Sequence, residues 1–263
     1  MKKITSRDNS FVKQLITLAH SSRERKKAKL TVLDGIHLVR AYTDSLGAAH
    51  ALAVAESALA KPEVVEMMAR YDDRHINVLS DTLMALASNL DSPANMLAIV
   101  PTPSAMVTPG NAQAVLILED IQDPGNVGSM LRSAAAAGVR DVLLSDTSAF
   151  AWSPKVLRAG QGAHFVLNIV EGVDVVAWIK NYEGQALALV PKAKKSLFEC
   201  HLQLPTALLI GNEGSGLSPA LIKAASEKVA IPMPGQMESL NAAAGAAIAL
   251  FELVRQRIHG QNH

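Results

Sequence analysis

The sequence offers little from which a disulfide or a membrane span could be built. Cys200 is its one cysteine among 263 residues, so no intramolecular disulfide can form and a reducing compartment is expected. For Cys200 a small buried apolar residue is favoured over a reactive thiol. No stretch approaches the roughly 18 uninterrupted apolar residues of a membrane span, and no apolar segment follows the N-terminal lysines. A cytoplasmic protein without a signal peptide is therefore expected.

Several motifs of other enzyme classes are also missing. The eight histidines are scattered, with no H-E-x-x-H pattern and no cysteine partner, so no metal site is expected. The absence of G-x-G-x-x-G and of G-x-x-x-x-G-K-[ST] argues against a nicotinamide-dependent dehydrogenase and a nucleotide triphosphatase. Aromatic residues make up only 4 % of a chain that is 49 % hydrophobic, which leaves alanine much of the apolar packing.

Basic residues gather at the start of the chain although the net charge is only +1. Residues 1–29 hold nine lysines and arginines against two acids, Asp8 and Glu24. Such a run suits a nucleic-acid backbone, and a solvated helix face is the alternative. The predicted RNA contacts are Arg23, Arg25, Lys26 and Lys27.

The pattern of apolar residues predicts an α/β protein of two domains. Residues 1–100 are predicted to form a small α/β domain, and the proline-rich residues 101–112 a linker. From 113 to 263, strands and helices alternate, which is typical of a parallel sheet covered on both faces. The expected helices are 9–21, 36–42, 127–137 and 240–258, with two more opening at Ser153-Pro154 and Ser218-Pro219. The expected strands are 30–33, 96–100, 114–118, 139–144, 166–170, 187–190, 207–210 and 229–231.

Three loops at strand ends carry residues suited to chemistry, because ligands of open parallel sheets bind beyond the carboxyl ends of the strands. In the first loop, Asn126 can cap a helix, Gly128 permits a close backbone approach and Arg132 can hold a phosphate. An ordinary helix cap followed by a surface arginine is the alternative for this loop taken alone.

The other two loops are rich in glycine and proline. Residues 211–216 hold three glycines, which free the backbone to wrap a flat ligand, and Glu213 can accept hydrogen bonds from ribose hydroxyls or orient a neighbour. Residues 231–235 hold two prolines, which leave backbone groups free to bind a purine edge, and Ser239 or Asn241 can cap the long helix. Taken separately, each loop is equally an ordinary turn or helix cap.

Together the three loops resemble the motifs of one enzyme family. NVGSMLR at 126–132, LLIGNEGSGLS at 208–218 and IPMPGQMESLNAAAGAAIALFE at 231–252 are similar, in order, to those of the SpoU-type RNA ribose methyltransferases of the knotted SPOUT superfamily. Residues 114–257 carry this resemblance. The N-terminal part is more loosely similar to that family's ribosomal-protein-like RNA-binding domain. The chain departs from the family pattern at Asp34, often Glu, and at Ala242-Ala243, often Val-Ser.

The resemblance implies a trefoil-knotted methyltransferase domain, a homodimer and transfer of a methyl group from S-adenosylmethionine to a ribose 2′-hydroxyl. The implied target is 23S ribosomal RNA, with transfer RNA or a catalytically silent RNA-binding protein as alternatives. The implied cofactor-binding residues are Gly211, Asn212, Gly216, Ile231, Met233, Leu240 and Asn241. The implied catalytic residues are Arg132, Asn126, Glu213, Ser239 and Asn241. Arg132 is expected to grip the phosphate next to the target ribose and polarise its hydroxyl.

Overall fold

The chain folds into two compact units, each described here by itself. The computed structural model describes residues 1–88 and 94–260. The first unit comprises Met1–Pro103 together with Trp152–Phe165, and the second comprises Ser104–Ala151 together with Val166–His263. The α/β class is confirmed. The finer division into 1–100, 101–112 and 113–263 stays a prediction, and it did not foresee that residues 152–165 group with the first unit.

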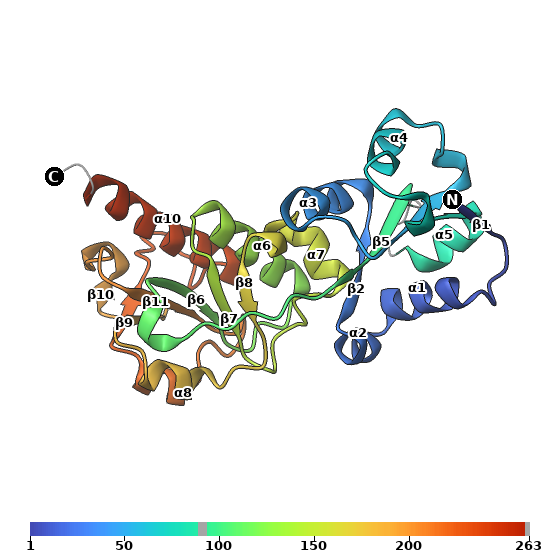
Figure 1. Cartoon of the computed structure of the whole chain (residues 1–263). Helices are drawn as coiled ribbons and strands as arrows, with labels where there is room; N and C mark the ends of the chain where they lie inside the picture. The colour runs from blue at the N-terminus through green and yellow to red at the C-terminus, as the bar shows by residue number, and fades with distance from the viewer. Residues whose placement is uncertain (89–93, 261–263) are drawn as a thin grey trace. The chain divides into compact units, whose positions relative to one another are not determined.

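A mixed five-stranded sheet forms the centre of the first unit (Figure 1). In spatial order its strands are β1-β4-β3-β5-β2, and β5 runs antiparallel to both of its neighbours, β2 and β3. Its strands are β1 (Lys2–Ile4), β2 (Leu30–Asp34), β3 (Ala51–Ala55), β4 (Ile76–Leu79) and β5 (Met96–Pro101). The two strands predicted for residues 1–100 are thus present, and three more were not predicted.

Helices complete the first unit. They are α1 (Ser10–His20), α2 (Ser22–Ala28), α3 (Ile36–Leu46), α4 (Pro62–Met68), α5 (Asp81–Ala87) and α7 (Pro154–Gly160). Helix α1 buries Val12, Leu15, Leu18 and Ala19, the apolar positions whose helical spacing predicted it. The segment 152–165 is held by a hydrogen bond of 2.7 Å from Thr31 Oγ1 to the Trp152 carbonyl and by edge-to-face packing of Phe165 on Tyr42.

The second unit is built on a seven-stranded sheet in which every pair of neighbours is parallel, as predicted. The spatial order is β10-β12-β9-β11-β6-β7-β8. The strands are β6 (Ala114–Leu118), β7 (Asp141–Leu144), β8 (Asn168–Val170), β9 (Gln185–Leu189), β10 (Lys195–Ser196), β11 (Thr206–Ile210) and β12 (Glu227–Ala230). Because all strands run the same way, their carboxyl ends gather at one edge of the sheet.

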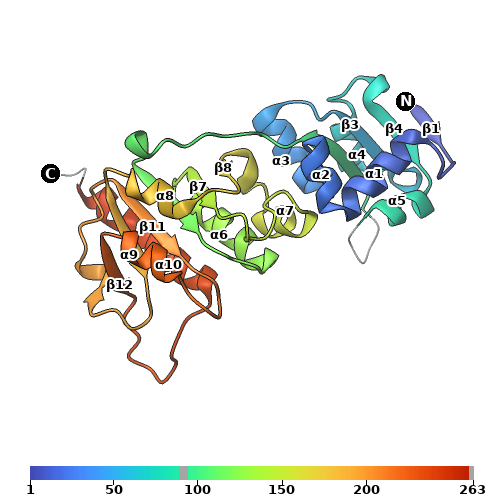
Figure 2. The ribbon, with the colours of Figure 1, turned by 90° about the horizontal axis from the view of Figure 1, so that it is seen from below.

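Helices cover both faces of this sheet. They are α6 (Pro124–Ala136), α8 (Val175–Lys180), α9 (Pro219–Ala224) and α10 (Ala242–Gly260). In Figure 1, α6 and α10 lie on one face and α8 on the other, and Figure 2 shows α9 beside α8. Strand β6 accordingly buries all of its last four residues, with Val115 and Ile117 in the core shared with α8. Such burial on both faces is expected of a parallel strand.

The residues that cap the starts of helices α6 and α10 determine which side chains remain available at the carboxyl edge of the sheet. Helix α6 begins at Pro124 and is capped by Asp123, whose side chain accepts a hydrogen bond from the Asn126 amide. The prediction that Asn126 caps this helix was therefore wrong, because proline fixes the first helical position earlier. Helix α10 is capped by Asn241, whose Oδ1 accepts from the amides of Ala243 and Ala244.

The alanine-rich start of α10 allows close packing, as its composition predicts. Ala246 and Ala249 are fully buried, and α10 packs against α6 and β11.

Part of the predicted linker is held in the second unit, where Trp178 Nε1 donates to the Val107 carbonyl and Tyr182 Oη donates to the Ala112 carbonyl. Within the described residues, no helix combines the length and apolarity that a membrane span needs.

Candidate active site

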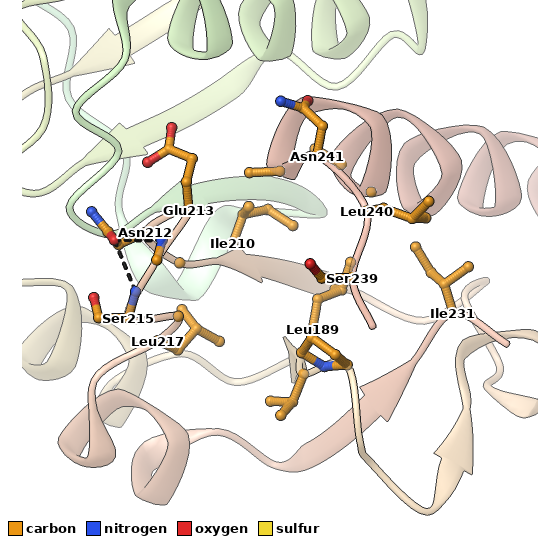
Figure 3. A pocket seen from close by; sticks show the side chains of 18 of the residues that line it. Leu189, Ile210, Asn212, Glu213, Ser215, Leu217, Ile231, Ser239, Leu240 and Asn241 are labelled. Carbon is orange, nitrogen blue, oxygen red and sulfur yellow. Dashed lines mark hydrogen bonds between the residues drawn. The ribbon is translucent and has the colours of Figure 1, made fainter. Parts of the chain in front are cut away.

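A pocket of about 360 Å³ opens at the carboxyl ends of three adjacent strands, β12, β9 and β11 (Figure 3). Its walls are the segments that follow these strands and the first turn of α10. Two of the three loops singled out in the sequence, 211–216 and 231–241, meet there. The third wall, Leu189–Pro191 at the end of β9, was not predicted, because a proline after a strand is the usual mark of any turn.

Glycine is required at position 211 by the closeness of the backbone. A Cβ at Gly211 would lie 2.3 Å from both the carbonyl carbon of Gly216 and the amide nitrogen of Leu217. The two ends of the loop are joined by paired hydrogen bonds between Asn212 and Gly216, of 3.1 and 2.9 Å. The loop is therefore a narrow hairpin whose tip, residues 213–215, is exposed at the pocket.

Asn212 fixes this hairpin from inside. Its Oδ1 accepts from the amides of Gly214 and Ser215 at 2.8 and 3.0 Å, and its Nδ2 donates to the Asp120 carbonyl at 2.8 Å. The side chain thus clamps the loop to the end of β6. The structure therefore shows Asn212 in the role of positioning the loop 211–216.

A chain of hydrogen bonds joins all three loops. Asn241 Nδ2 donates to Asn126 Oδ1 at 3.1 Å, and Asn126 Nδ2 donates to Glu213 Oε1 at 2.8 Å. The direction is set by the cap of α10: because Asn241 Oδ1 accepts backbone amides, its Nδ2 must donate. Glu213 and Asn241, at either end, line the pocket. All three residues are predicted from the sequence as site residues, but the contacts between them are not.

Every residue predicted to bind the cofactor lines this pocket. The seven are Gly211, Asn212, Gly216, Ile231, Met233, Leu240 and Asn241. Ser239 lines it as well. Arg132 does not: it is exposed on α6, which contributes no residue to the pocket wall. Within this chain, therefore, the arginine predicted to hold a phosphate is not part of the cavity wall.

The pocket fits S-adenosylmethionine in size and in chemistry. Its volume lies within the range of small-molecule sites, about 300–1,000 Å³. Leu189, Ile210, Ile231 and Leu240 supply apolar walls (Figure 3), and a glycine-rich hairpin supplies backbone groups at close range. Such an apolar cavity with few polar groups is the usual form of a cofactor site.

The basic run near the N-terminus needs one correction. Arg25 is only 4 % exposed, and its guanidinium donates to the carbonyls of Leu18 and Ala19 at the end of α1 and to Ser22 Oγ. It closes the α1–α2 corner and cannot dock RNA. Arg23, Lys26 and Lys27 are exposed on α2.

Two further features bear on the chemistry. Cys200 is buried, and burial raises the pKa of its thiol, which agrees with an inert apolar role. Among the residues that the structure describes, no three histidine, cysteine, aspartate or glutamate side chains are grouped to hold a metal ion.

Comparison with known proteins identifies the family. The model of the SpoU rRNA methylase family matches residues 113–251, more than half of the chain. The chain belongs to this family. It is 32 % identical to an uncharacterised tRNA/rRNA methyltransferase of Synechocystis, over 97 % of this chain and 94 % of that protein. It is 30 % identical to a 23S rRNA (guanosine(2553)-2′-O)-methyltransferase of Bacillus subtilis, over 96 % of this chain and 99 % of the relative.

Solved structures agree over both units. A crystal structure of an RNA 2′-O ribose methyltransferase superposes with a TM-score of 0.82 at 30 % identity, covering 97 % of this chain and 99 % of that one. The SpoU methyltransferase AviRb of Streptomyces viridochromogenes, solved with S-adenosylmethionine, gives 0.84 at 25 % identity, covering 95 % and 98 %. The SpoU chain described here is thus an S-adenosylmethionine-dependent RNA 2′-O-methyltransferase.

Proposed function

We propose that the enzyme methylates a ribose 2′-hydroxyl of 23S ribosomal RNA, with the pocket as its cofactor site and the Glu213–Asn126–Asn241 chain as its positioning machinery. The observation that carries this proposal is the hydrogen-bonded chain itself, which connects the first loop to two walls of the pocket. The relative of Bacillus subtilis, which matches nearly the whole chain, is named for this reaction on 23S rRNA.

The residues have separable tasks. When bound, S-adenosylmethionine supplies an activated methyl group, so the protein must orient a weakly acidic hydroxyl and stabilise its developing charge. Ser239 and Glu213 are among the polar residues that line the pocket, and Asn126 holds the Glu213 carboxylate in place. Glu213 Oε1 is occupied by Asn126, whereas Oε2 makes no hydrogen bond with the described residues, which leaves it free to accept one from a ribose hydroxyl.

Arg132 is proposed to grip the phosphate beside the target ribose and to polarise the hydroxyl. Arginine suits this task because its planar guanidinium binds a phosphate with two hydrogen bonds and stays charged. The side chain is exposed and makes no ion pair or hydrogen bond with the described residues, so it is available to a substrate.

A homodimer is part of the proposal. The exposed face of α10 carries Ile248, Phe251 and Ile258, which are 37 %, 48 % and 57 % exposed at helical spacing. An apolar stripe of this kind is typical of a surface that a partner covers. We further propose that the C-terminal segment of the second unit forms a trefoil knot. For the first unit we propose a ribosomal-protein-like RNA-binding role, with Arg23, Lys26 and Lys27 as contacts.

The test is methyl transfer to purified RNA. Labelled S-adenosylmethionine is offered with 23S rRNA lacking the modification or with transfer RNA, and the methylated position is mapped. Asn126→Ala and Arg132→Ala are expected to lower kcat by about two orders of magnitude or more, as loss of a transition-state contact does, while cofactor affinity stays within a few-fold.

Two control variants remove an asparagine and an arginine side chain outside the proposed site. Asn168 donates to the Asp141 carboxylate at 2.8 Å, as Asn126 does to Glu213, and Arg140 is an exposed arginine just before β7. Asn168→Ala and Arg140→Ala should keep full turnover. Methylation of transfer RNA alone would identify transfer RNA, and not 23S rRNA, as the substrate. Binding of RNA without methyl transfer would favour a catalytically silent RNA-binding protein.

A further inference from the structure

A hydrogen-bonded turn with two exposed lysines, Lys192 and Lys194, lies at the pocket rim. Pro191 and Lys192 are the central residues of a β-turn closed by a hydrogen bond of 3.2 Å from the Ala193 amide to the Val190 carbonyl. Val190 and Pro191 line the pocket, so Lys192 comes directly after the pocket wall. Consecutive Cα atoms are about 3.8 Å apart, which keeps the Lys192 backbone at the rim.

The turn is anchored on both sides. Before it, the Val190 amide donates to the Val229 carbonyl of β12 at 2.9 Å. After it, β10 pairs with β12, and Lys195 forms an ion pair of 2.6 Å with Glu227 of that strand. Of the three lysines in this segment, Lys195 is thus used to fix the turn.

The other two lysines, Lys192 and Lys194, have no such task. Both are exposed, and neither forms an ion pair or a side-chain hydrogen bond with the described residues. Neither lines the pocket, and both side chains are exposed to solvent next to its wall. Two uncompensated positive charges on a fixed turn attract an anion, and lysine binds phosphate as a point charge.

We propose that Lys192 and Lys194 bind backbone phosphates of the RNA strand next to the target nucleotide and so position the ribose at the pocket. This inference rests on the proposed function and adds to it. It assigns to the segment after β9 a substrate contact that is separate from the basic run of α2 and from Arg132. Because such contacts hold the strand rather than the reacting atoms, they are expected to act on RNA binding more than on turnover.

The experiment compares Lys192→Ala/Lys194→Ala with Lys180→Ala/Lys223→Ala. Lys180 ends α8 and Lys223 lies near the end of α9; both are exposed, and both helices lead back to the opposite edge of the sheet. KM for RNA and kcat are measured at several salt concentrations, S-adenosylmethionine affinity by calorimetry, and RNA binding without turnover by filter retention.

For the rim variant, the Kd and KM for RNA should rise roughly tenfold near 0.1 M salt, and the slope of log affinity against log salt should shrink by about 1.5–2, as expected for two lost phosphate contacts. Its kcat and cofactor affinity should stay within about twofold. The control variant should match the wild type. Unchanged RNA affinity, or a weakened cofactor affinity, would overturn the assignment. Filter retention needs no methyl transfer, so failure of the proposed reaction would be seen separately, as a wild-type enzyme that binds RNA without modifying it.

Discussion

Replacing Gly211 by alanine tests the pocket architecture most directly. The added Cβ would lie 2.3 Å from the Gly216 carbonyl carbon and the Leu217 amide nitrogen, and 2.6 Å from the Gly216 oxygen. All three are backbone atoms, so no side-chain rotation can relieve the clash. The hairpin must open, and the paired hydrogen bonds between Asn212 and Gly216 are the contacts that it would lose.

The magnitude follows from these contacts. Two backbone hydrogen bonds contribute about 1 kcal/mol each, and forcing a methyl group into a packed site costs about 1–3 kcal/mol. The substitution is therefore expected to cost roughly 3–5 kcal/mol. If the strain stays in the loop, S-adenosylmethionine affinity should fall by at least about two orders of magnitude, since 1.4 kcal/mol corresponds to a factor of ten.

The matched control lies three residues away. At Gly214 a Cβ would meet only Asn212 Oδ1, at 3.5 Å, which is an ordinary contact. Calorimetric titration with the cofactor and thermal unfolding are measured for both variants, because the strain of Gly211→Ala can appear as weaker binding or as a lower Tm. Equal cofactor affinity and equal Tm in the two variants would contradict a backbone clash at Gly211.

Three further outcomes are expected. Phe251→Glu should convert a dimer to a monomer in analytical ultracentrifugation by placing a charge on the apolar stripe of α10; a dimer that persists would exclude this face. Arg25→Met should lower the free energy of unfolding by about 2 kcal/mol in urea titration, unlike Lys26→Ala. Burial raises the pKa of Tyr182 from 10.0 to about 12. The contribution of its hydroxyl to the free energy of unfolding is therefore complete below pH 10 and is lost as the pH rises through 12. The stability gap between wild type and Tyr182→Phe should therefore shrink over that interval by about 1 kcal/mol, a value discounted for partial exposure; a constant gap would contradict this.

Sequence patterns predicted the parts of the site that depend on backbone chemistry. Gly211 and the prolines at 232 and 234 mark unusual turns at strand ends, and parallel strands bring such turns together, so two of the three pocket walls were predicted. No sequence pattern indicates contacts between side chains that are distant in the chain. A run of basic residues does not reveal that Arg25 points inward, because that depends on the angle between α1 and α2.

Two other differences have separate causes, a competition between neighbouring residues and a contact between distant ones. Asp123 and Asn126 both suit a helix cap, and Pro124 decided for Asp123, which released the Asn126 side chain to join Glu213 and Asn241. Residues 152–165 group with the first unit through Thr31 and Tyr42, more than a hundred residues earlier in the chain. The local pattern around Ser153-Pro154 predicts the helix α7 but carries no information on its partner.

The separation of Arg132 from the pocket leads to a last prediction, on how the proposed dimer completes its site. If the phosphate-gripping arginine reaches the pocket of the partner subunit, each site needs Gly211 from one protomer and Arg132 from the other. Arg132→Ala and Gly211→Ala, each inactive alone, would then complement each other. In a random mixture half of the dimers are mixed, and each mixed dimer holds one intact site of two, which restores about a quarter of wild-type activity.

Co-expression with two different affinity tags makes the mixture, and tandem purification isolates the mixed dimer, whose activity should reach about half of the wild type by the same reasoning. The control pairs Gly211→Ala with Asn241→Ala, because both positions lie in one pocket wall and neither protomer then offers an intact cavity. If each protomer used its own Arg132, the mixed dimer of Arg132→Ala and Gly211→Ala would be as inactive as this control, since every pocket would lack one of the two residues. Activity in the first pair alone can arise only when the guanidinium crosses the interface.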